Sequence, residues 1–173
     1  VQTCALPIYY DRPEIAAEEL PADAYRDDVA ANLAVAERWV TEHSDTEFDF
    51  FLPPYSILFW DKVIREGRTE AVFAAIRQAG QTLLQYDNVK FYGYLMDPEI
   101  VTNLDNYCDY IHHSGGVCRE ILAMLQREEG RLTEENLEET LANWREFVVH
   151  YDYDQFWDER FWIQWNAEHA AAP

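Results

Sequence analysis

Apolar residues recur along the chain with the two periods that distinguish helices from strands. A spacing of three to four residues predicts helices over residues 25–43, 57–65, 69–85, 116–126 and 133–149. Short apolar runs predict strands over 48–52 and 89–95, and Pro53 and Pro54 end the first, because proline cannot donate to a ladder. This order is typical of right-handed βαβ crossovers, so we expect an α/β fold with a parallel sheet.

The N-terminus does not continue this pattern. Residues 1–8 read VQTCALPI and resemble the translation of a common sequencing adapter; the alternative is an ordinary strand over residues 5–10. Two predicted strands are also fewer than the roughly five or six of an average sheet. We therefore expect residues 1–8 to be an artefact and residues 9–173 to be one α/β domain, the C-terminal portion of a longer protein.

The C-terminus is dense in aromatic residues, and residues 151–170 are expected to form a terminal helix. Aromatic rings can stack on the faces of sugars. A stripe such as Phe156, Trp157, Phe161 and Trp165 is nevertheless more often core or interface packing, which is the interpretation we favour.

Composition and charge exclude several classes of partner. The chain is 49% apolar, which is enough for a folded core. Its formal net charge is -20 and it has 13 Lys and Arg residues, so nucleic acid and anionic membrane surfaces are excluded, because phosphate binding needs clustered cations. The sequence contains no run of about twenty apolar residues, so no membrane-spanning segment is expected.

The candidate chemistry lies in residues 103–114, which read NLDNYCDYIHHS. This stretch follows a predicted strand and precedes a predicted helix, a place where ligands gather in open α/β sheets. Asp109 stands three residues before His112. A carboxylate that accepts a hydrogen bond from one imidazole nitrogen leaves the other free to take a proton. We expect Asp109 to orient the ring and His112 to act as the base of a catalytic pair.

Neighbouring residues have competing interpretations. A metal at Asp109, His112 and His113 is disfavoured because adjacent histidines rarely bind one ion without a third well-spaced ligand, and no cofactor is expected. Ser56 could contact a substrate at the end of the strand, but a serine just before an apolar run is more often a helix N-cap. We favour the cap, and we expect Ser114 to cap the following helix.

Two segments together resemble the SGNH (GDSL-like) family. They are FFLPPYS at residues 50–56 and the Asn-Leu-Asp-Asn-Tyr-x-Asp-x-x-His-x-Ser block at 103–114, and the likeness is to bacterial members associated with surface-polysaccharide modification. The resemblance covers roughly residues 45–140 and implies a three-layer, parallel-sheet, flavodoxin-like fold. In that family a Gly-Asp-Ser block supplies the nucleophile. This chain contains no Gly-Asp-Ser.

The resemblance implies that the whole protein is a serine acyltransferase or esterase acting on O-acyl groups of a surface glycan, in the periplasm or cell envelope. Asp109 and His112 would be catalytic, and Tyr55, Ser56 and His113 would contact the glycan or acyl-ester substrate. This chain alone would be inactive without its nucleophile and oxyanion donors. The alternative is a non-catalytic α/β binding or interaction module of a polysaccharide locus, in which Asp109 orients its loop and the aromatic C-terminus binds a partner.

Overall fold

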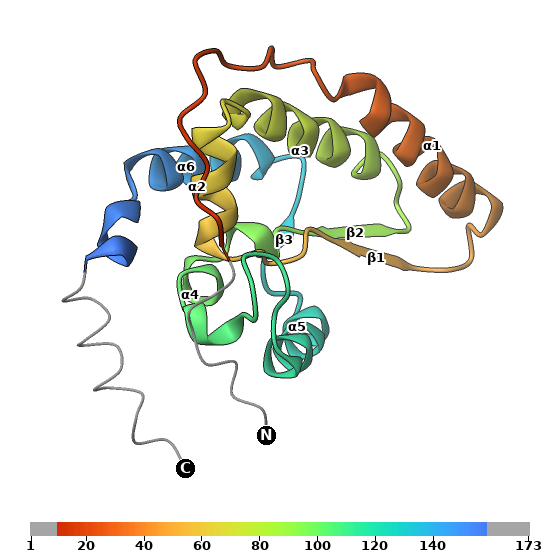
Figure 1. The fold of residues 1–173 in the computed structure, drawn as a ribbon. Helices are drawn as coiled ribbons and strands as arrows, with labels where there is room; N and C mark the ends of the chain where they lie inside the picture. Colours follow the sequence, from red (N-terminus) through yellow and green to blue (C-terminus); the bar gives the residue numbers. More distant parts are fainter. Residues whose placement is uncertain (1–9, 159–173) are drawn as a thin grey trace.

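The computed structural model describes residues 10–158, which form six α-helices and a three-stranded sheet (Figure 1). The helices are α1 Arg26–Glu42, α2 Ile57–Arg65, α3 Thr69–Leu83, α4 Pro98–Val101, α5 Gly115–Arg127 and α6 Leu137–His150. The strands are β1 Phe48–Phe51, β2 Val89–Tyr92 and β3 Arg131–Leu132, and the 3-10 helices are η1 Tyr94–Met96, η2 Leu104–Asn106 and η3 Tyr153–Trp157. The expected α/β fold is confirmed.

The sheet is mixed, so the prediction of a wholly parallel sheet is wrong. β1 and β2 are parallel, with Phe48 beside Val89. β3 runs antiparallel to β2, with Leu132 opposite Phe91. The sequence pattern does not predict β3 because its two residues are too few to show the alternation that marks a strand.

The helices divide between the two faces of the sheet (Figure 1). On one face α1, α2, α3 and α6 enclose the main hydrophobic core, which includes Phe91. On the other face α5 covers a smaller cluster that includes Tyr92, Val117 and Ile121. Successive side chains of a strand point to opposite faces, and the neighbours Phe91 and Tyr92 therefore belong to different clusters.

Residues 10–20 form an irregular segment, the N-terminal strap, which lies along α2 (Figure 1). Two backbone N–H groups of the strap donate to the end of α2, from Ala16 to the Arg65 carbonyl and from Leu20 to the Gly67 carbonyl, each over 2.7 Å. These bonds tie a segment without regular structure to a buried helix.

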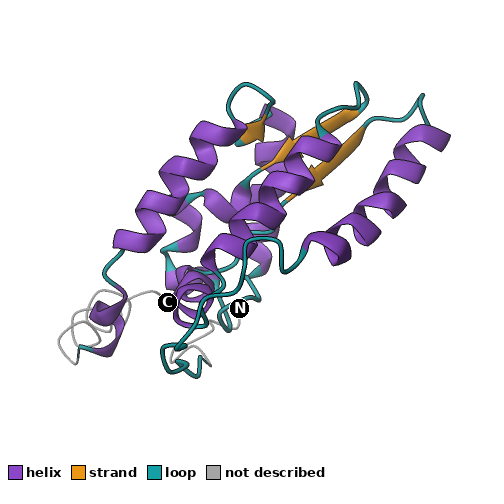
Figure 2. Cartoon of the chain, turned by 90° about the horizontal axis from the view of Figure 1, so that it is seen from above, coloured by secondary structure: helices purple, strands orange, loops and turns teal. Residues whose placement is uncertain are grey.

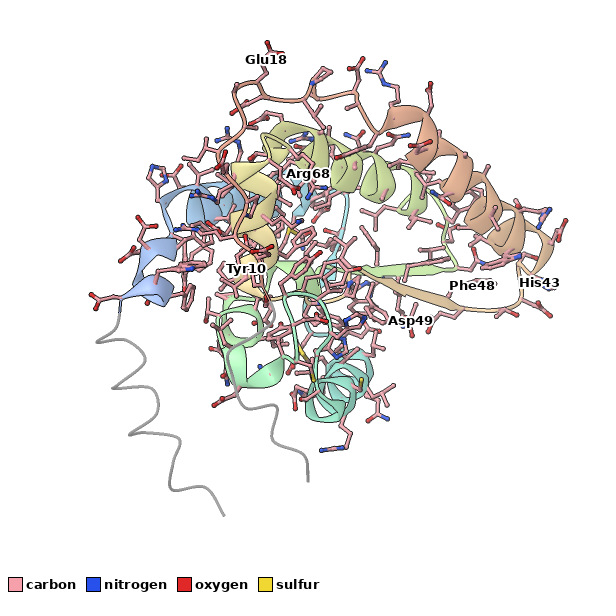
Figure 3. The ribbon with its side chains drawn as sticks, in the orientation of Figure 1. Tyr10, Glu18, His43, Phe48, Asp49 and Arg68 are labelled. Atoms are coloured by element: carbon pink, nitrogen blue, oxygen red, sulfur yellow. The ribbon has the colours of Figure 1, made fainter. Side chains whose placement is uncertain are left out.

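The strap also carries Arg12, which joins α2 to η3. Its guanidinium donates to the buried Asp61 carboxylate from Nε at 2.9 Å and Nη2 at 3.0 Å. Nη1 reaches Asp154 at 2.7 Å, and the guanidinium carbon lies 4.0 Å from the ring centroid of Trp157. The Tyr10 hydroxyl donates to Asp61 as well, and burial together with this bond raises the pKa of Tyr10 above its ordinary value. Figure 3 shows Tyr10 beside α2.

At the C-terminal end, the described part of the predicted helix over residues 151–170 begins as the 3-10 helix η3. Tyr153 and Phe156 are buried there, as expected for packing, and Trp157 remains half-exposed. The rest of that segment lies outside the described residues, as do residues 1–8, so the adapter interpretation stays a prediction. Among the helices of residues 10–158, none combines the length and the apolar character needed to cross a membrane.

Candidate functional site

Residues 103–114 form a loop, named here the Asp109 loop, that is fastened to the chain between β1 and α2. The Tyr107 hydroxyl donates to the Pro54 carbonyl over 2.9 Å. The backbone N–H and the hydroxyl of Ser56 both donate to the Tyr110 carbonyl, over 3.1 and 3.0 Å. The sequence gives no local signal for these contacts, because the bonded residues are separated by 53 positions in one case and by 54 in the other.

The carboxylate of Asp109 organises the loop from within. Its Oδ1 accepts the backbone N–H groups of Ile111 and His112, each over 2.7 Å. Its Oδ2 lies 2.6 Å from Nδ1 of His112, so the pairing that the spacing predicts is present. Partial burial opposes ionisation of Asp109, but the hydrogen bonds from His112 and Ile111 outweigh it and hold the pKa of Asp109 below its ordinary value.

The imidazole of His112 is presented to solvent. Its side chain is 76% exposed, whereas that of Asp109 is 30% exposed. An ionised carboxylate can only accept, so the hydrogen bond to Asp109 places a proton on Nδ1 of His112. In the neutral ring Nε2 is then an acceptor that faces outward, where it can take a hydrogen bond or a proton from a bound group.

The other predicted site residues have structural contacts of their own. Ser56 is fully buried at the N-cap position of α2, but its hydroxyl bonds to Tyr110 and not to the helix. The half-buried ring of Tyr55 lies 5.0 Å from that of Phe59. His113 is half-buried, with Nδ1 3.7 Å from Sγ of the exposed Cys118 on α5.

Ser114 occupies the N-cap position of α5, as predicted, without a side-chain cap bond. Within the described part of the chain, no group of three or more His, Cys, Asp or Glu side chains is arranged to hold a metal ion. The structure thus brings Asp109 and His112 together as a pair, holds Ser56 behind them as an anchor, and directs His113 toward α5.

Replacing Asp109 with asparagine should destabilise the protein by about 1 kcal/mol at neutral pH, because the loop loses charge-assisted hydrogen bonds at a partly exposed position. The pKa of Asp109 is lowered, so its contribution is present above the ordinary value of 3.8 and is lost as the pH falls through the lower value in the folded state. Urea unfolding of both proteins at pH 7 and pH 3 checks this. An equal gap in stability at the two pH values would contradict it.

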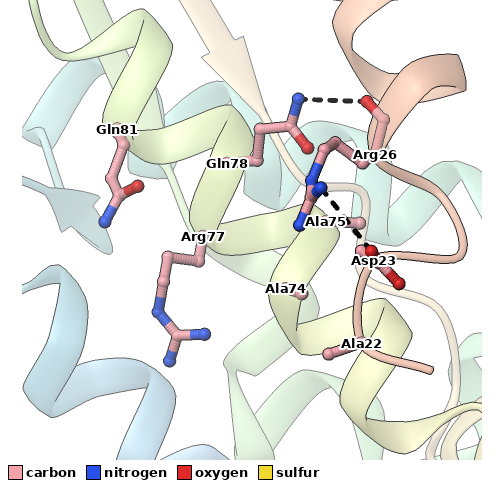
Figure 4. A pocket seen from close by; sticks show the side chains of 8 residues that line it. All are labelled: Ala22, Asp23, Arg26, Ala74, Ala75, Arg77, Gln78 and Gln81. Carbon is pink, nitrogen blue, oxygen red and sulfur yellow. Dashed lines mark hydrogen bonds and ion pairs between the residues drawn. The ribbon is translucent and has the colours of Figure 1, made fainter.

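Two hollows lie away from the Asp109 loop. The larger, of about 460 Å³, lies between the start of α1, with the turn before it, and α3 (Figure 4). Its lining consists of small and polar side chains, namely Ala22, Asp23, Arg26, Ala74, Ala75, Arg77, Gln78 and Gln81. The smaller, of about 340 Å³, borders Gly93, Asp97 and Gly130. Neither is lined by Asp109 or His112. The exposed ring of His112 places the candidate site at the surface.

Comparison with known proteins changes the functional picture. No family model and no solved structure matches the chain. Two curated relatives are UPF0735 ACT domain-containing proteins of Lacticaseibacillus casei (strain BL23) and Lacticaseibacillus paracasei (strain ATCC 334). Each is 24% identical over 90 residues, which are 52% of this chain and 62% of the relative. The chain therefore spans less than two thirds of the length of the curated relatives it matches.

These findings overturn the resemblance to the SGNH family and, with it, the acyltransferase or esterase activity on a glycan or acyl-ester substrate. The SGNH-type fold that the resemblance implies is not shown. The matching relatives carry a different domain name, and nothing in the comparisons points to GDSL-like proteins. The motif misleads because a three-residue Asp-to-His spacing arises readily by chance in a chain with 33 acidic residues and five histidines. Over about half its length, the chain is similar to ACT domain-containing proteins.

Proposed function

We propose that this chain is a non-catalytic binding module whose recognition surface is the Asp109 loop. One observation carries the proposal: the Asp109 carboxylate accepts two backbone N–H groups and one imidazole N–H, all from its own loop. Short acidic side chains used in this way build turns. The position of Asp109 is therefore explained by loop architecture, without a reacting group beside it.

Two further observations support a binding role. Ser56, the serine that sequence analysis associates with the site, is fully buried and its hydroxyl is engaged with the Tyr110 carbonyl. The curated relatives are named for a domain, and their printed names state no catalytic activity.

The chemistry of His112 indicates what the surface binds. Nε2 of the neutral ring accepts a hydrogen bond, so it suits a ligand that offers a hydroxyl or an amide N–H. The bond to Asp109 fixes the orientation of the ring before the ligand arrives. This preorganisation reduces the side-chain entropy lost on binding.

Thermal denaturation with a panel of small hydroxyl- and amide-containing compounds tests the proposal, with carboxylates that lack such donors as the comparison set. Binding compounds should raise the melting temperature of the wild type and of the control variant His150→Ala, which alters an exposed histidine on α6. They should fail to stabilise His112→Ala and should bind Asp109→Asn about tenfold more weakly.

Hydrolysis of p-nitrophenyl acetate provides the opposing test. Turnover by the wild type that disappears in His112→Ala would contradict a non-catalytic module. Equal stabilisation of the wild type and His112→Ala by every compound that binds would show that the Asp109 loop is not the recognition surface.

A further inference from the structure

The sheet has an open edge at β1. β1 is the outermost strand in the order β1-β2-β3, and no other strand of residues 10–158 pairs with its second side. The Phe48 N–H donates to the Asn88 carbonyl and the Leu52 N–H to the Tyr92 carbonyl, both over 2.9 Å. Backbone groups alternate in direction along a strand, so the N–H and C=O of Asp49 and Phe51 point to the open side.

One helix and two exposed side chains border the open edge of β1. Seen from above, α1 lies alongside β1 with the opposite chain direction, on the side away from β2 (Figure 2). An added strand would therefore lie next to β1 under α1. On the opposite face of the sheet, Phe51 is 41% exposed. Asp49, which Figure 3 labels, is exposed as well. The side chains of a partner strand could pack against both.

The open edge is acidic. Glu47 and Asp49 are exposed and stand two residues apart, so they share one face of the extended segment, and Asp45 is exposed in the turn before it. The Lys90 ammonium forms an ion pair with the Glu47 carboxylate over 3.0 Å, whereas the Asp49 carboxylate forms no ion pair within residues 10–158. A second copy of the chain would bring like charges together at such an edge, which is a common protection against self-association. A basic strand would be attracted.

We propose that the β1 edge docks an extended segment of a partner protein that carries alternating Lys or Arg residues, and that this segment adds to the sheet as a fourth strand. The main chain of Asp49 and Phe51 supplies the hydrogen bonds, which give affinity in strand addition. The basic side chains of the partner lie on the face of the sheet that carries Glu47, Asp49 and Phe51, and its alternate apolar side chains point to the opposite face, under α1. This surface is separate from the Asp109 loop and does not rest on the function proposed for it.

The probe is a fluorescein-labelled octapeptide of alternating lysine and valine, titrated with the full chain and followed by fluorescence anisotropy. A peptide of the same composition with four lysines followed by four valines controls for charge alone. The alternating peptide should bind at least about tenfold more tightly, because only it places all its lysines on one face of a strand.

Asp49→Lys should weaken the binding of the alternating peptide about tenfold. Glu134→Lys, an equal change in net charge near α6, should change it less than about twofold.

A backbone variant and amide exchange separate strand addition from charge attraction. Phe51→Pro removes an N–H that faces the open side, a position where an edge strand tolerates proline, and it should weaken binding. Hydrogen exchange at Asp49 and Phe51 should slow when the alternating peptide binds. His112→Ala should bind the peptide like the wild type, so this inference and the proposed function fail independently.

Three results would overturn the inference. The first is equal affinity of the two peptides, and the second is equal affinity of Asp49→Lys and the wild type. The third is a dimer of the chain alone that shields the Asp49 and Phe51 amides, because the edge would then belong to a second copy.

Discussion

Arg12→Ala is expected to destabilise the protein by about 3–5 kcal/mol, because it leaves a buried carboxylate without its counter-charge. The Asp61 side chain is 3% exposed, and two nitrogens of the Arg12 guanidinium reach its oxygens within 3.0 Å. In the variant, the Tyr10 hydroxyl is the remaining strap donor to Asp61. Urea unfolding followed by tryptophan fluorescence measures the loss.

Two controls separate the buried ion pair from the other contacts of Arg12. Asp154→Asn removes the second acidic partner of the same guanidinium, but Asp154 is 85% exposed, so we expect a loss of about 0–1 kcal/mol. The double variant Arg12→Met with Asp61→Leu removes both charges and should recover most of the stability lost in Arg12→Ala. If Arg12→Ala cost no more than Asp154→Asn, a buried Arg12–Asp61 pair could not be a major source of stability.

The longer helices could be predicted from the sequence because their signal is local, whereas the four-residue α4 was not predicted. In α1, α2, α3 and α5 the apolar period of one buried face ends close to where each helix ends, at Glu42, Arg65, Leu83 and Arg127. The parallel pairing of β1 with β2 also follows from the order of the elements. By contrast, residues 11–24 are acidic and contain two prolines, a composition that predicts no packed element, although the contact from Arg12 to Asp61 makes the strap part of the fold.

In the candidate site, too, contacts between near neighbours in the sequence could be predicted and contacts between distant residues could not. The pairing of Asp109 with His112 could be predicted because it spans three residues of one loop. The anchoring role of Ser56 could not, since it depends on a carbonyl 54 positions away, and the same serine also fits the local pattern of an N-cap. Assigning a family from this short motif failed for the same physical reason: a local spacing specifies a turn, and a turn is compatible with many functions.

Gly67→Ala is the second change for which we expect a large effect, about 2–4 kcal/mol of destabilisation. Gly67 has φ 64, a left-handed conformation that disfavours alanine. A Cβ at this position would lie 2.5 Å from the Glu18 carbonyl oxygen and 3.0 Å from Cα of Glu19. Both atoms belong to the backbone of the strap, so a side-chain rotation cannot relieve the clash, and the strap must move away from α2.

Gly115→Ala is the matched control, because the nearest atom to its Cβ would be the flexible end of Arg119 at 3.9 Å. We expect its stability to stay within about 0.5 kcal/mol of the wild type. Amide exchange at Leu20, whose N–H donates to the Gly67 carbonyl, should quicken in Gly67→Ala and not in Gly115→Ala. A Gly67→Ala protein as stable as the wild type, with a protected Leu20 amide, would contradict the close contact between strap and helix.

Combining Gly67→Ala with Arg12→Ala tests whether the strap acts as one unit. Gly67 contacts the strap at Glu18, and Arg12 fastens its other end to Asp61. If either change alone detaches the strap, the second change has little left to disrupt. The double variant should then lose clearly less stability than the sum of the two single losses, whereas independent contacts would add to within about 0.5 kcal/mol.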